Sequence, residues 1–112
     1  MIYNKSPAGV KKVLSDAADL IERTGWTRGA NARRKDGAAV PWESDSAACF
    51  CTSGAITRVT NGDFNLCTLA RHTLLSHIGD PDNPLGVTGW NDYTGRTKEE
   101  VLAALRAAAA AP

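Results

Sequence analysis

The stretch TGWNDYTGRTKEEV, residues 88–101, decides how the last part of the chain folds. Its second half predicts a helix, because Thr97 and Glu100 have the spacing of a capping box, in which the Thr hydroxyl accepts an amide proton and the Glu carboxylate reaches back to a backbone N–H. Its first half places a Trp-Asn-Asp cluster, residues 90–92, directly before that helix. We expect this cluster to form a turn that either closes a small core or presents a binding platform.

Outward from this stretch, apolar residues recur at helical spacing in four segments. The first begins at Ser6-Pro7, because a Ser side chain caps free amides and Pro fits the first helical position. Asp63 can cap the third, and residues 44–46 offer caps for the second. The connection 80–96 holds two prolines and three glycines and is expected to form no helix or strand. The four predicted helices are 7–24, 44–60, 63–78 and 97–110.

Between the first two helices the pattern changes. Asp36-Gly37 is a turn signal between short segments that could pair as a hairpin, whereas their Ala and Arg content fits an ordered loop equally well. We therefore expect a mainly α, compact four-helix domain with a short β-hairpin or ordered loop between helices 1 and 2. A length of 112 residues and a hydrophobic share of 43% suit a single domain spanning 1–112.

The small net charge argues against partners that are attracted by a strong overall electrostatic field. With 13 basic and 12 acidic residues the formal net charge is +1, which would not draw in nucleic acid or an anionic membrane. The sequence has no apolar run of membrane-spanning length, and its first residues lack the apolar core of a signal peptide. We expect a cytoplasmic protein with no membrane contact. Three cysteines, Cys49, Cys51 and Cys67, are an odd number and favour reduced thiols.

Catalytic and metal chemistry find little support in the sequence. We expect Cys51 to lie about six residues inside the second helix, beyond the first turn where the helix dipole favours a thiolate, and to be structural. His72 and His77 diverge by about 140° around a helix, so they are poorly placed to share a metal ion. We expect His77 to pack in the core and His72 to face water. The sequence thus predicts no catalytic residue, metal or cofactor and favours a protein that is not an enzyme.

Three segments, AADLIERTGWTRG, CTSGAI and WNDYTGRTKEEVLAALRAA, occur in this order along the chain. In that order they resemble a family of small uncharacterised proteins from bacteria, notably actinobacteria, and from phages, known only as a domain of unknown function. The motifs are Gly25-Trp26, Cys51 to Ala55 in a Cys-x-x-Gly-Ala pattern, and the Trp-Asn-Asp cluster; the polar Thr52-Ser53 and the extra Cys49 depart from the family pattern. The resemblance implies an architecture and no reaction, and by analogy an accessory, host-directed role.

The functional hypotheses centre on the ends of the first and last helices. Antiparallel packing of these helices would bring the two ends together, and an aromatic floor with hydrogen-bonding walls is typical of a recognition pocket. The predicted binding residues are Trp26, Arg28, Trp90, Asn91, Asp92 and Arg96.

Our leading hypothesis is a non-enzymatic protein-interaction or accessory module, possibly phage-related, that contacts a protein partner or associates with itself. The first alternative is a small-ligand-binding protein or enzyme that uses the Trp-Asn-Asp cluster. The second is nucleic-acid binding through the basic loop 28–35, where Arg33, Arg34 and Lys35 could contact phosphates and Trp42 could add a stacking face.

Overall fold

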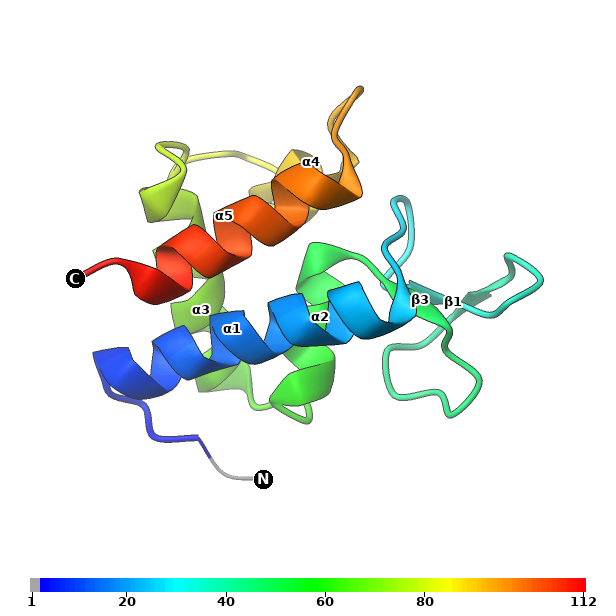
Figure 1. The fold of residues 1–112 in the computed structure, drawn as a ribbon, viewed down its shortest axis with the longest axis horizontal. Coiled ribbons are helices and arrows are strands. Elements are labelled where there is room, and N and C mark those ends of the chain that lie inside the picture. The colour runs from blue at the N-terminus through cyan, green and yellow to red at the C-terminus, as the bar shows by residue number, and fades with distance from the viewer. Residues whose placement is uncertain (1–2) are drawn as a thin grey trace.

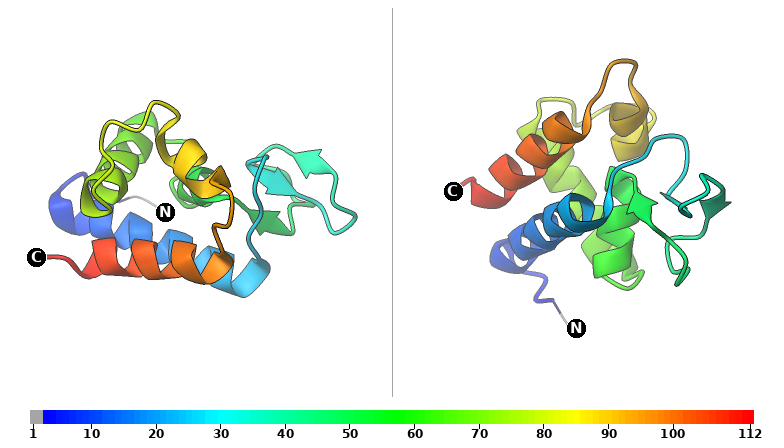
Figure 2. Two further views of the ribbon diagram at one scale, coloured as in Figure 1. Left: turned by 90° about the horizontal axis from the view of Figure 1, so that it is seen from above. Right: turned by 45° about the vertical axis from the view of Figure 1, so that its right-hand side comes forward.

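The computed structural model describes residues 3–112, and within that range it contains five helices and a small three-stranded sheet. Helices α1 (Pro7–Thr24) and α5 (Lys98–Ala110) lie side by side and run in opposite directions, with α2, α3 and α4 on the other side of the core (Figures 1 and 2). The sheet lies beyond the C-terminal end of α1. The antiparallel packing expected for the first and last helices is therefore present.

The predicted caps place three of the helices correctly. The Ser6 side chain accepts a hydrogen bond from the Gly9 amide at the start of α1. Asp63 accepts from Leu66 at the start of α3 (Phe64–His77), and Thr97 forms the complete capping box with Glu100 before α5. Each cap satisfies an amide that the first helical turn leaves without a partner.

The connection between the first two helices contains a β-hairpin. Strands β1 (Ala32–Arg33) and β2 (Ala39–Val40) pair antiparallel around the predicted Asp36-Gly37 turn. The turn is closed by the Gly37 amide, which donates to the Arg34 carbonyl at 2.9 Å. Gly37 has a φ of +91°, a conformation in which an L side chain is strained.

The prediction that the second helix begins near residue 44 is wrong. Ser44 caps a local turn, because its hydroxyl accepts from the Ser46 amide at 3.2 Å. The chain then forms strand β3 (Cys49–Phe50), which pairs antiparallel with β1 and completes a sheet of order β2-β1-β3. Helix α2 is Thr52–Val59, and its N-cap is Cys51. Cys51 is therefore at the helix end and not six residues inside.

Residues 80–96 also differ from the prediction, because they contain helix α4 (Gly86–Asp92) and bring the helix count to five in the described chain. No side chain caps α4, and its sequence holds Gly86 and Gly89, so local signals for a helix are weak. Burial of Val87, Trp90 and Asn91 holds it in place. The Trp-Asn-Asp cluster therefore ends a short helix and does not form a turn.

The core lies between the two helical layers. The apolar residues that recur at helical spacing in α1, Val10, Val13, Leu14, Ala17 and Ile21, are buried. The placement of His77 in the core is wrong, because this residue is exposed and Ile78 packs against the core. His72 is exposed as expected. Within residues 3–112 no helix is both long and apolar enough to cross a bilayer. The largest fully buried apolar side chains are Phe50, Leu14, Ile21, Ile56, Leu74, Leu105, Val13 and Val101.

Candidate functional site

The side chain of Asn91 is completely buried and joins three parts of the chain. Its Oδ1 accepts hydrogen bonds from Trp26 Nε1 at 2.7 Å, from the Thr52 amide at 2.9 Å and from Thr52 Oγ1 at 2.6 Å. Its Nδ2 donates to the Thr27 carbonyl at 3.2 Å and to Asp92 Oδ1 at 2.9 Å. Both amide protons and the oxygen are thus used internally, so Asn91 holds α4 against α2 and the segment after α1.

The two tryptophans of the predicted site take different positions. Trp90 is buried in the core, with 8% of its surface exposed, while Trp26 is half-buried and packs against the core edge. Trp26 donates a hydrogen bond to Asn91 of α4. The end of the first helix is therefore joined to the segment before the last helix through α4, a helix that was not predicted. The indole rings act mainly as packing groups here.

Two arginines stack on the aromatic residues. The guanidinium of Arg96 lies 4.5 Å from the centre of the Trp90 ring and 5.5 Å from that of Tyr93, and its Nε donates to the Trp90 carbonyl at 3.0 Å. Arg28 lies over Trp26 at 5.2 Å and donates to the Arg96 carbonyl. We call Trp26, Arg28, Tyr93 and Arg96 the arginine–aromatic surface. Its most exposed aromatic, Tyr93, has 67% of its surface accessible and was not predicted as a site residue.

A pocket of about 250 Å³ lies beside Asp92, the residue that follows Asn91. The loop that follows α1, the N-cap of α2 and one face of α4 form its walls. Asp92 is the predicted binding residue that lines it, and its carboxylate is fixed by the Gly29 amide at 3.1 Å. We call this hollow the Asp92 pocket. Its six lining residues are Gly29, Ala30, Asn31, Cys51, Thr88 and Asp92.

Cys51 contributes a buried thiol to the Asp92 pocket. Its sulfur caps α2 by accepting the Gly54 amide at 3.2 Å, and it lies 3.7 Å from Asn31 Oδ1. Burial raises the pKa of this thiol; the nearby Asp92 charge raises it further, and the bonds from helix amides oppose the rise without cancelling it. Cys51 is therefore a neutral thiol at neutral pH, which suits a structural role and disfavours nucleophilic attack.

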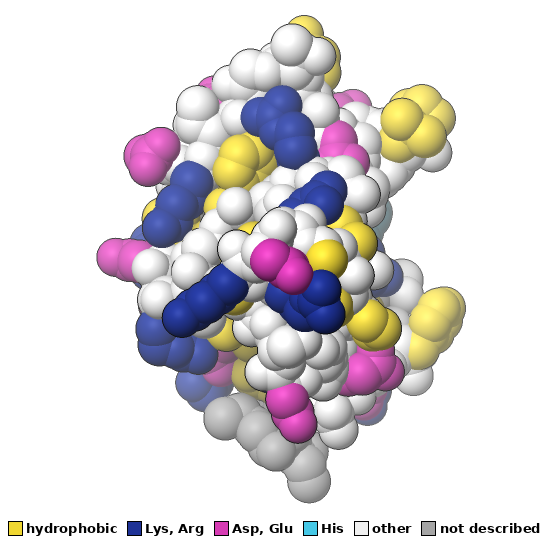
Figure 3. All heavy atoms as spheres, turned by 90° about the vertical axis from the view of Figure 1, so that its right-hand side faces the viewer, with side chains coloured by type: hydrophobic (Ala, Val, Ile, Leu, Met, Phe, Trp, Pro, Cys, Tyr) yellow, Lys and Arg dark blue, Asp and Glu magenta, His cyan; other side chains and the backbone are white. Residues whose placement is uncertain are grey.

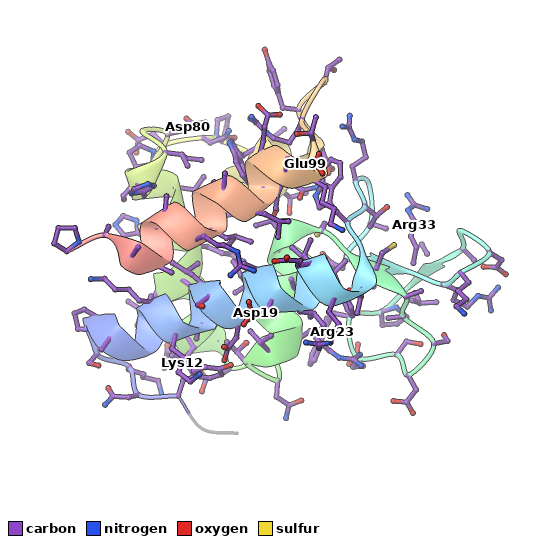
Figure 4. The ribbon with its side chains drawn as sticks, in the orientation of Figure 1. Lys12, Asp19, Arg23, Arg33, Asp80 and Glu99 are labelled. Carbon is purple, nitrogen blue, oxygen red and sulfur yellow. The ribbon has the colours of Figure 1, made fainter. Side chains whose placement is uncertain are left out.

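The arginines of the basic loop 28–35 are largely bound within the hairpin. Arg33 donates to Thr27 Oγ1, to the Gly37 carbonyl and to the Arg28 carbonyl at 2.9 to 3.0 Å, and Figure 4 shows it beside the sheet. Arg34 pairs with Asp36 at 2.8 Å. Figure 3 shows acidic and neutral side chains among the basic ones at this end. The described residues contain no group of three or more side chains placed to hold a metal ion.

The arrangement of the predicted residues is now clear. Trp26, Asn91 and Trp90 form a scaffold, Arg28 and Arg96 cover it, and Asp92 faces the pocket. Sequence reasoning missed Cys51 and Thr88 as lining residues; the signal for Cys51 was its place three residues before Gly54, which is the spacing of an N-cap to the amide it accepts.

Comparison with known proteins gives a family and no activity. No curated protein and no solved structure matches the chain. One family model matches residues 5–111, which is nearly the whole chain. The chain therefore belongs to DUF6197, a family of unknown function.

Proposed function

We propose that this protein is a non-enzymatic interaction module that contacts a protein partner, or a second copy of itself, through the arginine–aromatic surface. The observation that carries the proposal is the stacking of Arg96 between Trp90 and the exposed Tyr93. Tyr and Arg are enriched at the centres of protein interfaces. Because Arg96 is already held by its stacking and its bond to the Trp90 carbonyl, it would lose little side-chain entropy on binding.

The chemistry of the neighbouring groups favours binding over catalysis. Asn91 has no donor left for a substrate, and the Cys51 thiol is protonated at neutral pH because burial and the Asp92 charge raise its pKa. We also propose a cytoplasmic location. A phage-related accessory role directed at a host is a further proposal, and it rests on the resemblance to small proteins of bacteria and phages.

Nucleic acid is the weaker candidate partner. The guanidinium of Arg33 is committed to three internal acceptors, and that of Arg34 is paired with Asp36. Phosphate binding by the basic loop 28–35 would have to displace these bonds. Nuclease treatment and salt dependence separate this candidate from a protein partner.

The test combines capture and self-association. Tagged protein is used to capture partners from nuclease-treated bacterial lysate, and sedimentation measures self-association of the purified chain. Tyr93→Ala should abolish capture or association, because it removes the exposed ring of the surface. Phe64→Ala is the matched control, since Phe64 is 77% exposed but lies at the start of α3.

Both variants should keep the thermal stability of the native chain, because both rings are exposed. Equal binding by Tyr93→Ala and the native chain, or capture that disappears with nuclease, would contradict the proposal. Capture that survives Phe64→Ala and is lost with Tyr93→Ala supports it.

A further inference from the structure

We propose that the Asp92 pocket binds a small organic cation, with an ammonium group on the Asp92 carboxylate and a polar group on the opposite wall. This site is separate from the arginine–aromatic surface and does not depend on the function proposed for it. A volume of about 250 Å³ is smaller than that of most drug-binding pockets, so the ligand is a small one.

The wall of the pocket carries a negative charge. Asp92 is the one charged residue among the six that line the pocket. Its Oδ1 accepts from the Gly29 amide at 3.1 Å and from Asn91 Nδ2 at 2.9 Å, and both donors are uncharged. Among residues 3–112, no Lys, Arg or His nitrogen lies within 4.0 Å of this carboxylate. A ligand that pairs with Asp92 would therefore supply the missing positive charge.

Two arginines close to Gly29 in the sequence, Arg28 and Arg33, are bound to other groups. Arg28 lies over Trp26 and donates to the Arg96 carbonyl. The guanidinium of Arg33 is shared among Thr27, Arg28 and Gly37. Neither arginine lines the pocket, although a Cβ atom on Gly29 would lie 3.3 Å from an Arg33 guanidinium nitrogen, so Asp92 is the charged side chain that a ligand inside the pocket meets.

Hydrogen bonds orient the Asp92 carboxylate. Asp92 is fixed by two hydrogen bonds from different segments, the loop that follows α1 and the buried Asn91. A carboxylate that is already oriented loses little freedom when it binds a cation, so more of the ion-pair energy remains for affinity. Gly29 has a φ of +79°, and in this conformation its N–H donates to the Asp92 carboxylate.

The lining of the pocket also includes uncharged polar residues. Thr88, which carries a hydroxyl, and Asn31, which carries an amide, line the pocket and are exposed. Either can accept from an ammonium or bond to a ligand hydroxyl. The Cys51 thiol is neutral and adds an apolar, polarisable floor. This set of one anion, one hydroxyl and one amide fits an amino alcohol or a similar small amine.

The experiment is an NMR titration of the whole chain with ethanolamine, with acetate as an anionic probe of similar size. Amide shifts of Gly29, Ala30 and Thr88 should saturate with a dissociation constant of about 1 mM or weaker, as expected for a ligand of four heavy atoms. Acetate should give no saturable shift there. Low ionic strength is used so that the Asp92 charge is not screened.

Two variants locate the site. Asp92→Asn keeps an oxygen for the Gly29 amide but removes the charge, and it should weaken ethanolamine binding at least about fivefold, which is roughly the attraction of one ion pair in water. Asp45→Asn removes an exposed charge in the loop before β3 and should leave the titration unchanged. Thr88→Phe, at an exposed position of α4, should fill the pocket and abolish the shifts if Asp92→Asn does not fold.

Three results would overturn the proposal. They are the absence of a saturable shift at an ethanolamine concentration about fifty times the expected dissociation constant, an equal response to acetate, and full ethanolamine binding by Asp92→Asn. Tyr93→Ala should leave the titration intact, so failure at one site is distinguishable from failure at the other.

Discussion

At the residue scale, Asn91 links three segments that are far apart in the sequence. Its carboxamide presents an acceptor to Trp26 and Thr52 and donors to the Thr27 carbonyl and Asp92. An aspartate at this position would lose both donors and would place a second carboxylate against Asp92. An apolar residue of similar size would leave the Thr52 amide buried without a partner. The position therefore requires an amide of this length.

Replacing Asn91 by Leu should lower the free energy of unfolding by about 3 kcal/mol, because several buried polar groups lose their partner at once. Urea denaturation followed by circular dichroism measures the change. Asn65→Leu, at an exposed position of α3, is the control and should change stability by less than about 0.5 kcal/mol. Equal stability of the two variants would show that the Asn91 network contributes nothing measurable.

The Cys51 sulfur has a capping role that a hydroxyl can take over. Cys51→Ala removes the acceptor for the Gly54 amide and should lower the free energy of unfolding by about 1 kcal/mol, whereas Cys51→Ser should retain most of the cap. Thermal and urea unfolding of both variants measure the difference. A serine variant as unstable as the alanine variant would mean that packing of the sulfur, and not capping, sets the stability.

The same thiol predicts how stability changes in alkali. Because burial raises the pKa of native Cys51 above its ordinary value of 9.0, the native state holds this proton at a pH where the unfolded chain has released it. Its contribution is fully present below about pH 9 and is lost as the pH rises through the native pKa. Urea unfolding between about pH 8 and pH 10 should show a steeper decline for the native chain than for Cys51→Ser. Parallel curves would contradict the assignment.

At the element scale, the caps explain which helices could be predicted from the sequence. Three helices begin after Ser6, Asp63 and Thr97. Each of these side chains accepts a hydrogen bond from the backbone amide three residues later, so the signal is local in the sequence. Strand β3 and helix α4 have no such local cause. Phe50 donates to the Gly25 carbonyl from across the fold, and α4 is held by burial. Long-range contacts of this kind leave no periodic pattern in a two-residue strand or a seven-residue helix.

The same distinction applies to the candidate site. That the ends of the first and last helices would meet near the tryptophans could be predicted from helix lengths and positions. The depth of Asn91 and the pocket lined by Cys51 and Thr88 could not, because both depend on where α2 and α4 begin. The predicted start of the second helix, residue 44, lies eight residues before the observed start at Thr52, and this difference placed Cys51 in a helix interior when it is the N-cap.

Helix α2 approaches the loop that follows α1 too closely for a side chain at Gly54. A Cβ atom there would lie 2.0 Å from the Asn31 carbonyl oxygen, a backbone atom held by its bond to the Cys51 amide. Gly54→Ala should lower the free energy of unfolding by about 3 kcal/mol, although alanine favours helix by about 1 kcal/mol. Thermal unfolding measures the change.

Gly37→Ala provides a matched control for this prediction. A Cβ atom at Gly37 would meet nothing within 4 Å, so its cost is limited to the positive φ of +91° and should be about 1 kcal/mol. Equal destabilisation by the two variants would show that the contact between α2 and Asn31 can relax.

At the scale of the whole molecule, the two proposed sites lie at the same end and the C-terminus lies at the other. The arginine–aromatic surface and the Asp92 pocket are built from the segment after α1, from α4, from the segment between α4 and α5 and from the N-cap of α2. The C-terminal end of α5 lies beside the N-terminal half of α1 (Figure 1). An affinity tag on the C-terminus would therefore leave both sites free for the binding experiments.

Apolar packing and ion pairs on the outside hold α1 and α5 together as an antiparallel pair. Leu105 is fully buried, while the neighbouring Arg106 reaches across to Asp19 at 3.0 Å and to Glu22. Figure 4 shows Asp19 on α1 in front of this seam. Because the Arg106 side chain and both of its partners are exposed, water screens these ion pairs, and they are expected to contribute little.

Leu105→Ala and Arg106→Ala test which interaction holds the layer together. The first leaves a cavity in the core and should lower the free energy of unfolding by about 3 kcal/mol, whereas the second should lower it by less than about 1 kcal/mol. Urea unfolding at low and high salt separates the two variants further. The difference in free energy of unfolding between the native chain and Arg106→Ala should shrink as salt screens the charges, whereas the difference for Leu105→Ala should not. A large, salt-independent loss in Arg106→Ala would mean that the stem of this side chain packs on α1 and that the seam depends on it as much as on Leu105.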